Sequence, residues 1–269
     1  MAEAFFTEDG DTLVPSDLTR GPWDPGSQNA GPPAAAVGRA LERHERAEGR
    51  QIGRVTFEIL RPVPIAPLRI EVRTVRPGRS VELLEALLTD RKGKELVRAS
   101  CWRLATVEIE LNGQLPEDPA LPGPGDGEHK PFFPTGEEVG YHTAMEYRFV
   151  RGAFMDRGPA TVWMRMLHPL VAGEEPTALQ RVLVAADSGN GVSAALDWRK
   201  YVFINTDLSV HLHRLPAREW VCLDAVTRPE PNGLGLSDTA LYDEQGPIGR
   251  AAQTLFVRER APSDGVTEV

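Results

Sequence analysis

The sequence predicts an α+β protein made of two similar halves, in each of which an antiparallel sheet wraps around a central helix. Three observations support this fold class. Each half has a helix-like segment followed by a run of strand-like segments. The turns between those segments are too short for crossover helices, so neighbouring strands should be antiparallel. The second run also repeats the first at an offset of 153 residues, without a gap from residue 55 to residue 104.

The first half begins with a turn-rich stretch up to residue 31, in which short strands could lie at 4–7 and 12–15. Pro32 to Glu48 follows, with small alanines at its start and charged residues at its end. This composition predicts a helix whose small face lets another backbone or a ligand come close. Alternation of apolar and polar residues then predicts strands at 55–59, 68–72, 81–89 and 95–105.

Residues 113–139 are rich in proline, glycine and acidic residues, which predicts a linker that runs over the surface. Alternation of apolar and polar residues resumes after this linker. It predicts further strands at 143–150, 160–167, 201–204, 207–213, 220–226, 234–242 and 248–257.

One helix is predicted from Pro176 to Asn190, between the second and third of these strands. Proline suits the first helical position, and Gly189 with Asn190 is typical of a helix end. Leu179, Val182, Leu183 and Ala186 form its apolar stripe. Asp187 comes directly after the stripe. A carboxylate there should lie beside the core, although the C-terminal end of a helix is unfavourable for an acid.

The offset of 153 residues places Val55, Phe57 and Ile59 on Leu208, Val210 and Leu212. A helix followed by a long antiparallel run packs most simply when the sheet curves around the helix. Two such sheets joined edge to edge also remove a pair of exposed strand edges. The sequence therefore predicts a double hot-dog fold, divided into an N-terminal unit (1–112), a linker (113–139), a C-terminal unit (140–262) and a tail (263–269).

Composition narrows the class of protein. The net charge of −9 argues against a nucleic-acid surface, which requires a basic face. No apolar run is long enough to span a bilayer, and the acidic start is unlike a signal peptide. Cys101 and Cys222, both in strand-like runs, fit buried thiols in a reducing compartment. We therefore expect a cytoplasmic protein with no nucleic-acid or membrane partner.

The two halves differ at a few polar positions, and these positions indicate a site. Gln253 falls on Ser100, and Asn205 falls on Ile52. Asp187 falls near residues 40–42, where Glu42 is the one ambiguity. Structural positions should match in type between the copies, whereas a functional site can be kept in one copy. A catalytic cluster of Asp187, Asn205 and Gln253 in the C-terminal half is therefore predicted.

The second half resembles the acyl-CoA thioesterase II (TesB-like) family through A-A-D at 185–187, D-L-S-V-H-L-H-R at 207–214 and A-A-Q at 251–253. The first half resembles it through V-T-F-E-I-L-R-P at 55–62 and the glycine and prolines at 31–33. The resemblance implies a double hot-dog hydrolase in which an Asp, a Thr and a Gln hold the attacking water. Asp187 and Gln253 match two of these residues. The Thr position falls on Asn205, with Thr206 as its neighbour.

The residue types suit that chemistry. Asp187 can act as the general base, because burial raises a carboxyl pKa toward neutrality. Asn205 and Gln253 can each donate and accept hydrogen bonds, and so can orient the water. Gly31 opens the first helix, where backbone N–H groups could stabilise an oxyanion, although it is equally typical of a turn glycine. We take Gly31 and Thr206 as candidate substrate-binding residues and expect no cofactor and no metal.

Other motifs give weaker evidence for a functional site. His211 and His213 share a strand face, but no third metal ligand is evident, so a surface or interface role is favoured. No G-x-S-x-G motif occurs, and Ser188 is typical of a helix end. The run D-S-G-N at 187–190 faintly resembles hydratase-type hot-dog proteins, but no histidine follows nearby. Three basic residues could meet CoA phosphates: Arg199, Lys200 and Arg258.

The favoured hypothesis is hydrolysis of acyl-CoA thioesters to free acid and CoA by an activated water. A non-catalytic binder of acyl-CoA or acyl-carrier groups and an enoyl-CoA hydratase-like protein are the alternatives. Pairing of two double units into a homodimer is compatible with the sequence, which says nothing of acyl chain length.

Overall fold

The computed structural model describes residues 3–45, 48–113 and 120–261. The N-terminal half consists of β1 (Phe6–Asp9), β2 (Thr12–Pro15), α1 (Gly31–Arg43), β3 (Arg50–Ile59), β4 (Leu68–Arg76), β5 (Val81–Asp90) and β6 (Glu95–Ala105). The C-terminal half consists of α2 (Tyr141–Ala144), β7 (Met145–Arg151), β8 (Ala160–Met166), α3 (Ala178–Ala186), α4 (Gly189–Val192), β9 (Tyr201–Asn205), β10 (Asp207–Leu212), β11 (Val221–Pro229), β12 (Leu234–Asp243) and β13 (Gly246–Glu259).

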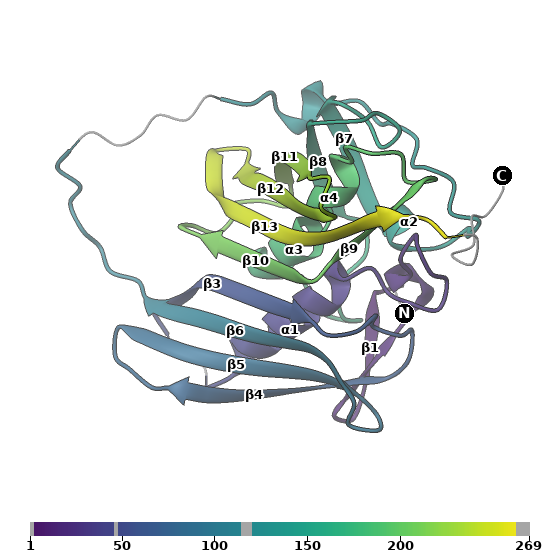
Figure 1. Ribbon diagram of the computed structural model, residues 1–269. Coiled ribbons are helices and arrows are strands. Elements are labelled where there is room, and N and C mark those ends of the chain that lie inside the picture. Colours follow the sequence, from purple (N-terminus) through teal and green to yellow (C-terminus); the bar gives the residue numbers. More distant parts are fainter. Residues whose placement is uncertain (1–2, 46–47, 114–119, 262–269) are drawn as a thin grey trace.

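All strands of the described residues belong to one antiparallel sheet, which curves around the helices (Figure 1). The strand order is β1-β2-β4-β5-β6-β3-β10-β13-β12-β11-β8-β7, and β9 also pairs with β13. The two half-sheets join where β3 pairs with β10. This arrangement confirms the predicted double hot-dog fold.

The junction of β3 and β10 shows the duplication directly. Thr56 and Ser209 are equivalent under the sequence offset (209 − 56 = 153), and they face each other across the strand pair. Ser209 Oγ donates a hydrogen bond to Thr56 Oγ1 at 3.1 Å. On either side, Val55 pairs with Val210 and Phe57 with Leu208. An approximate two-fold axis therefore passes through the Thr56–Ser209 pair and relates the two halves.

The core lies between the curved sheet and the central helices. Helix α1 contacts β4 and β5, helix α3 contacts β8 and β11, and the two helices pack on each other. Small residues make this close approach feasible. A Cβ atom on Gly31 would lie only 2.3 Å from the backbone oxygen of Val184, and one on Gly38 would lie 2.4 Å from Leu183 Cδ1.

The structure corrects the extent of the second predicted helix. Helix α3 begins at Ala178, and Thr177 caps it: the Gln180 backbone N–H donates to Thr177 Oγ1 at 3.2 Å. The T-x-x-Q spacing of a capping box was thus the true start signal, and Pro176 lies outside the helix. The helix ends at Ala186, and Gly189 begins the separate short helix α4 instead of ending α3.

Other element ends shift by a few residues. Helix α1 ends at Arg43 instead of Glu48, and Glu45 adopts a left-handed backbone with φ of 40°. The strand predicted from residue 143 begins at Met145, because α2 occupies the residues just before it.

The segment predicted as a linker packs partly against the C-terminal half. Phe133 is buried, and the Trp163 indole N–H donates to the Pro122 carbonyl at 2.8 Å. Glu128 pairs with Phe149 beside β7. Residues 114–119 and the predicted tail (263–269) lie outside the described residues, so the predicted unit boundaries stay predictions. None of the helices in the described part of the chain is long and apolar enough to cross a membrane.

Gly31→Ala should destabilise the protein, because the new methyl group would overlap the Val184 backbone and force α1 away from α3. We expect a loss of about 1–3 kcal/mol in the free energy of unfolding, measured by denaturant titration. Gly125→Ala is the matched control, since no atom lies within 4 Å of its added Cβ. Equal stability of the two variants would contradict this account of the helix packing.

Candidate active site

The structure brings together Asp187, Asn205 and Gln253. Asp187 directly follows α3, Asn205 ends β9, and Gln253 lies within β13. Asn205 Nδ2 donates to Asp187 Oδ1 at 2.8 Å, and Gln253 Nε2 donates to the same oxygen at 3.1 Å. The two amides share the inner face of the sheet, because Asn205 pairs with Leu255, two residues beyond Gln253. Strand pairing therefore places both amides beneath the end of the helix.

Both polar atoms of the Gln253 side chain are engaged in hydrogen bonds. Its Nε2 also donates to the Asp187 backbone carbonyl at 3.1 Å, and its Oε1 accepts the Asn190 backbone N–H at 3.1 Å. Only 2% of the residue is exposed. The side chain is thus a fixed support for the Asp187 carboxylate, with its hydrogen-bonding groups already occupied.

The N-terminal half completes the site through the start of α1. The backbone N–H groups of Ala30 and Gly31 face the Asp187 carboxylate and favour its charged form. The Gly31 N–H also lies 2.9 Å from Asn29 Oδ1. An acid at the end of α3 is unfavourable for that helix, but here it faces the positive end of α1. The site is therefore shared by the two halves: the three polar side chains come from the C-terminal half, and the start of α1 at Gly31 comes from the N-terminal half.

Burial raises the pKa of Asp187 from its ordinary value of 3.8 to about 6. Removal of the carboxylate from water is the largest cause. The hydrogen bonds from Asn205, Ala30, Gln253 and Gly31 act in the opposite direction, because they favour the charged form. The result is a carboxylate that is ionised at neutral pH but still basic enough to take a proton.

A cavity of about 480 Å³ opens beside Asp187. Asp187, Ser188 and Asn205 form part of its wall, and Ala30 contributes from the other half. The rest of the wall is largely apolar and aromatic. Its aromatic lining residues are Trp23, Phe132, Phe133, Tyr141, Tyr147, Phe154, Tyr201 and Phe203.

Tyr141 and Ser188 link the cavity wall to the helix end. Tyr141 Oη donates to the Val184 carbonyl at 2.7 Å, so the Ser188 hydroxyl, 3.0 Å away, donates to Tyr141 Oη. Burial raises the pKa of the Tyr141 hydroxyl well above its ordinary value, which keeps the phenol neutral. These two residues fix the backbone on either side of Asp187.

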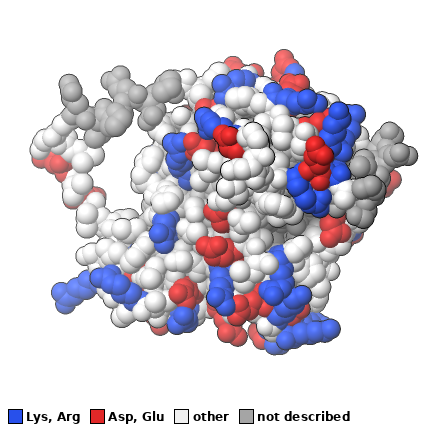
Figure 2. Space-filling model, viewed as in Figure 1, with Lys and Arg blue, Asp and Glu red and all other residues white. Residues whose placement is uncertain are grey.

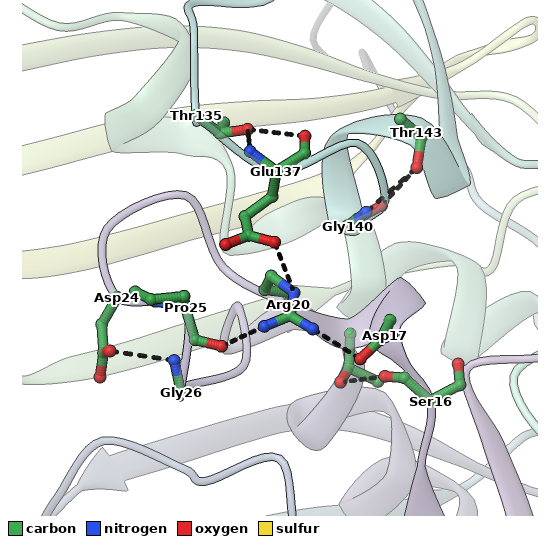
Figure 3. Close-up of polar contacts among 11 residues, drawn as sticks. Ser16, Asp17, Arg20, Asp24, Pro25, Gly26, Thr135, Glu137, Gly140 and Thr143 are labelled. Carbon is green, nitrogen blue, oxygen red and sulfur yellow. Dashed lines mark hydrogen bonds and ion pairs between the residues drawn. The ribbon is translucent and has the colours of Figure 1, made fainter. Parts of the chain in front are cut away.

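An arginine connects the loop that carries Trp23 with the segment just before α2 (Figure 3). The Arg20 guanidinium donates to Asp17 Oδ1 at 2.6 Å and to the Pro25 carbonyl, and it lies 3.8 Å from Glu137. The Arg20 carbonyl also accepts the Tyr141 N–H at 2.9 Å. The loop that carries Trp23 is therefore fastened to the segment that leads into α2.

The structure places the two predicted substrate-binding residues differently. Thr206 is exposed and lines the rim of the cavity; its hydroxyl lies 3.4 Å from the Thr254 carbonyl, to which it can donate. Gly31 does not line the cavity. Its N–H faces Asn29 and Asp187, and its missing side chain makes room for Val184. Close packing of α1 on α3 thus explains why this residue is a glycine, without a contact to the cavity.

Other predicted candidates lie outside the cluster. His213 Nε2 hydrogen-bonds to the Pro247 carbonyl at 3.0 Å, and neither His211 nor His213 lines the cavity. Among the described residues, no group of three acidic, histidine or cysteine side chains could hold a metal ion. The hydrogen-bond partners of Asp187 include no histidine, which weakens the hydratase alternative.

Sequence reasoning missed the contributions of Asn29, Ala30, Tyr141 and Asn190. One signal was available for the cavity wall. Trp23, Phe132 and Phe133 are large aromatic residues inside otherwise polar, turn-rich segments. Large aromatic side chains pack against apolar surface, so their presence in these loops is a signal that the loops cover the core or a cavity.

Family models match both halves of the chain. The profile of the Acyl-CoA thioesterase C-terminal domain matches residues 116–257, and that of the Acyl-CoA thioesterase N-terminal domain matches residues 19–104. A comparison with curated protein sequences gave no match.

Solved structures share the fold over nearly the whole chain. A hot-dog protein of unknown function from Alicyclobacillus acidocaldarius has a TM-score of 0.72 at 16% identity, covering 96% of both chains. An acyl-CoA thioesterase II from Mycobacterium marinum has a TM-score of 0.66 at 15% identity, covering 94% of this chain and 95% of that one. A tesB protein from Mycobacterium avium subs paratuberculosis has a TM-score of 0.66 at 16% identity, covering 94% and 96%.

Asp187→Asn should remove a pH dependence from the stability of the protein. A carboxyl whose folded pKa is raised contributes stability below its unfolded pKa of 3.8, and this is lost as pH rises through about 6. An amide stays neutral throughout, so the stability of the variant relative to wild type should rise by about 3 kcal/mol between about pH 3 and about pH 8. Urea unfolding across this range measures the difference.

Asp156→Asn, at an exposed position outside the cavity lining, controls for the loss of one charge. A difference between Asp187→Asn and wild type that did not change with pH would contradict the raised pKa.

Proposed function

This chain belongs to the acyl-CoA thioesterase family, and from that premise we propose that it hydrolyses acyl-CoA thioesters to free acid and CoA by an activated water. The observation that carries the proposal is the buried Asp187 carboxylate. It lies at the wall of a largely apolar cavity, with a pKa raised to about 6 and amide donors fixing its orientation. A positioned base with a pKa near the working pH is what water activation requires.

In the proposed reaction, a water in the cavity attacks the thioester carbonyl carbon while Asp187 takes the proton. A carbon–oxygen bond forms, and the carbonyl becomes a tetrahedral oxyanion. When the oxyanion collapses, the carbon–sulfur bond breaks and CoA leaves as the thiolate. The proton held by Asp187 then passes to the thiolate, which restores the carboxylate for the next turnover.

The two amides have different parts in this proposal. Gln253 is fully engaged and does not line the cavity, so it orients Asp187 and does not contact the water. Asn205 lines the cavity and uses one N–H on Asp187 Oδ1. An amide nitrogen carries two N–H groups, so the second can donate to the thioester oxygen. A threonine hydroxyl has one hydrogen and could not do both, which gives the asparagine at this position a function.

Basic residues at the cavity rim support CoA as the leaving group. Arg61, Arg258 and Arg260 line the cavity, and the planar guanidinium suits phosphate recognition. Figure 2 shows basic side chains, interleaved with acidic ones, on the side of the molecule where β13 ends. Of the other basic candidates, Arg199 stacks over the Trp198 ring at 5.5 Å and Lys200 is exposed, and neither lines the cavity.

Asp187→Asn should abolish most hydrolysis, because an amide cannot accept the proton from water. We expect kcat to fall roughly 10²–10⁴-fold. Release of free thiol from a panel of acyl-CoAs of different chain length measures the rate. Asp156→Asn should keep the wild-type rate. Full activity of Asp187→Asn beside an active wild type would refute the assignment of the base.

Asn205→Ala should move the pH profile of hydrolysis upward. In the wild type, kcat/KM should rise through about pH 6 as Asp187 ionises and then level off. The Asn205 hydrogen bond lowers the pKa of Asp187, so its removal should raise the midpoint as well as lower the plateau. A lower plateau with an unchanged midpoint would show that Asn205 does not support the carboxylate.

A further inference from the structure

The segment that follows β6 extends away from the body of the protein (Figure 1). We call residues 106–111 the arm; they come directly after Ala105, the last residue of β6. Figure 2 shows open space between this segment and the rest of the protein. The Thr106 N–H fastens the base of the arm by donating to the Gly49 carbonyl at 2.7 Å. Beyond this point, residues 107–111 belong to no strand and make no backbone hydrogen bond to the described part of the chain.

The arm has the side-chain pattern of a strand that covers a core on one face. Val107, Ile109 and Leu111 are 73%, 68% and 61% exposed, and the exposed Glu108 and Glu110 alternate with them. Successive side chains of an extended chain point to opposite faces, so the three apolar residues share one face and the two acids share the other. Neighbouring exposed apolar side chains indicate an interaction surface. The arm therefore has the pattern of a half-buried strand without a sheet to join.

The N-terminal half offers a free sheet edge at β4. Strand β5 pairs along one side of β4, whereas β2 pairs with the other side only at Leu68. Residues 70–76, which we call the β4 edge, pair with no strand of the described residues on that second side. Ile70 and Val72 pack against the core but are only partly buried. Such an edge presents unpaired backbone N–H and carbonyl groups, to which an extended segment can add as a further strand.

The arm and the β4 edge complement each other in apolar side chains and in charge. Ile70 and Val72 lie on the inner face of β4, whereas Arg69 and Arg73 point out to solvent. Residues 69–76 contain three arginines and one glutamate, while the arm contains two glutamates and no basic residue. A strand added here in the matching orientation places its apolar residues beside Ile70 and Val72 and its acids beside the arginines.

The two arginines have donors left for further carboxylates. Arg69 lies 3.3 Å from Asp11, and Arg73 pairs with Glu85. Their side chains nevertheless remain 49% and 73% exposed. Because a guanidinium carries five N–H donors, each arginine can bind a second carboxylate without giving up the first.

We propose that two copies of this chain form a dimer by exchanging arms, so that the arm of each copy adds to the β4 edge of the other. One chain carries both the arm and the edge, so a two-fold axis satisfies both contacts at once and closes the assembly. The dimer buries the apolar face of the arm and pairs the backbone of a free strand edge. This assembly does not depend on the proposed hydrolysis.

The path of the chain favours a second copy over the arm's own β4 edge. The arm continues from β6, and β5 lies between β6 and β4. After the arm, the chain runs to the C-terminal half, where the Pro122 carbonyl accepts the Trp163 indole N–H of β8. Strand β8 lies far from β4 in the strand order of the sheet. An arm folded back onto its own β4 would therefore lead the chain away from where it must go next.

Ile109→Asp should weaken the dimer, because a carboxylate would replace the central apolar side chain of the arm. We expect the wild type to sediment at the mass of two chains, and the dissociation constant to rise roughly a hundredfold or more in the variant. Sedimentation velocity over a range of protein concentrations measures both. Circular dichroism should show an unchanged fold, since Ile109 is exposed within its own chain.

Leu167→Asp is the matched control, because Leu167 is 51% exposed but lies just after β8, away from the arm and the β4 edge. Its dissociation constant should equal that of the wild type. A wild type that stays monomeric at every concentration would overturn the proposal. A dimer that Ile109→Asp leaves equally tight would do the same.

A charge exchange tests which two surfaces meet. One variant reverses the arm (Glu108→Lys with Glu110→Lys), and a second reverses the edge (Arg69→Glu with Arg73→Glu). Each variant alone should dimerise roughly tenfold or more weakly at low salt, because like charges would face each other in both contacts. An equimolar mixture should regain the dimer, because reversed arm meets reversed edge in one contact and the original pair meets in the other.

Recovery in the mixture would support exchange between copies. A mixture that dimerises no better than its two components would refute it, because an arm bound to its own chain or to another protein gains nothing from mixing. Thiol release is not needed for any of these measurements, so the dimer can fail while the proposed hydrolysis stands, and the reverse.

Discussion

The contact on which the rest of the site depends is that between the start of α1 and the carboxylate at the end of α3. Backbone N–H groups of Ala30 and Gly31 face Asp187, which is otherwise buried at the unfavourable end of its own helix. The contact requires the two helices to touch, and Gly31 allows this because it has no side chain to meet Val184. The Asp187 cluster is therefore complete only when the two halves are packed together.

The two halves keep one architecture and have diverged in the polarity of their inner faces. The offset of 153 residues places Leu84 on Ser237 and Ala86 on Thr239, and all four residues are buried. In the C-terminal half, these hydroxyls lie beneath Gly189: a Cβ there would be 2.5 Å from Thr239 Oγ1 and 3.2 Å from Ser237 Oγ. The short helix α4 thus rests directly on a polar strip of sheet. Its Asn190 N–H can then hold Gln253.

The sheet positions the polar side chains of the site, whereas the loops shape its cavity. Strands β9 and β13 fix the amides, because strand pairing determines which residues share a face and how far apart they are. The loops around Trp23 and Phe132 shape the cavity, and Arg20 fastens them to each other near the mouth. This division separates the polar cluster, which needs rigid placement, from the largely apolar cavity wall, which loops can reshape more freely.

Much of the fold was readable from residues alone. Alternation located the strands, and the constant offset revealed the duplication, because side-chain period and strand register are local properties that the sequence encodes directly. The ends of the second helix were predicted wrongly. Pro176 and Gly189 marked its predicted ends, whereas the Thr177–Gln180 capping box begins the helix and it ends at Ala186. For the site, Asn205 and Gln253 differ in type from Ile52 and Ser100 in the first half, whereas Asp187 falls near residues 40–42, where Glu42 left an ambiguity.

The sequence by itself determined the strands, the duplication and the identity of the three polar side chains. Only the tertiary structure decided that the backbone N–H groups at the start of α1, which the sequence suggested as oxyanion donors, face the Asp187 carboxylate. It also decided that every hydrogen-bonding group of the Gln253 side chain is occupied. Hydrogen-bond partners and burial arise from contacts between distant segments, and no local pattern in the chain records them.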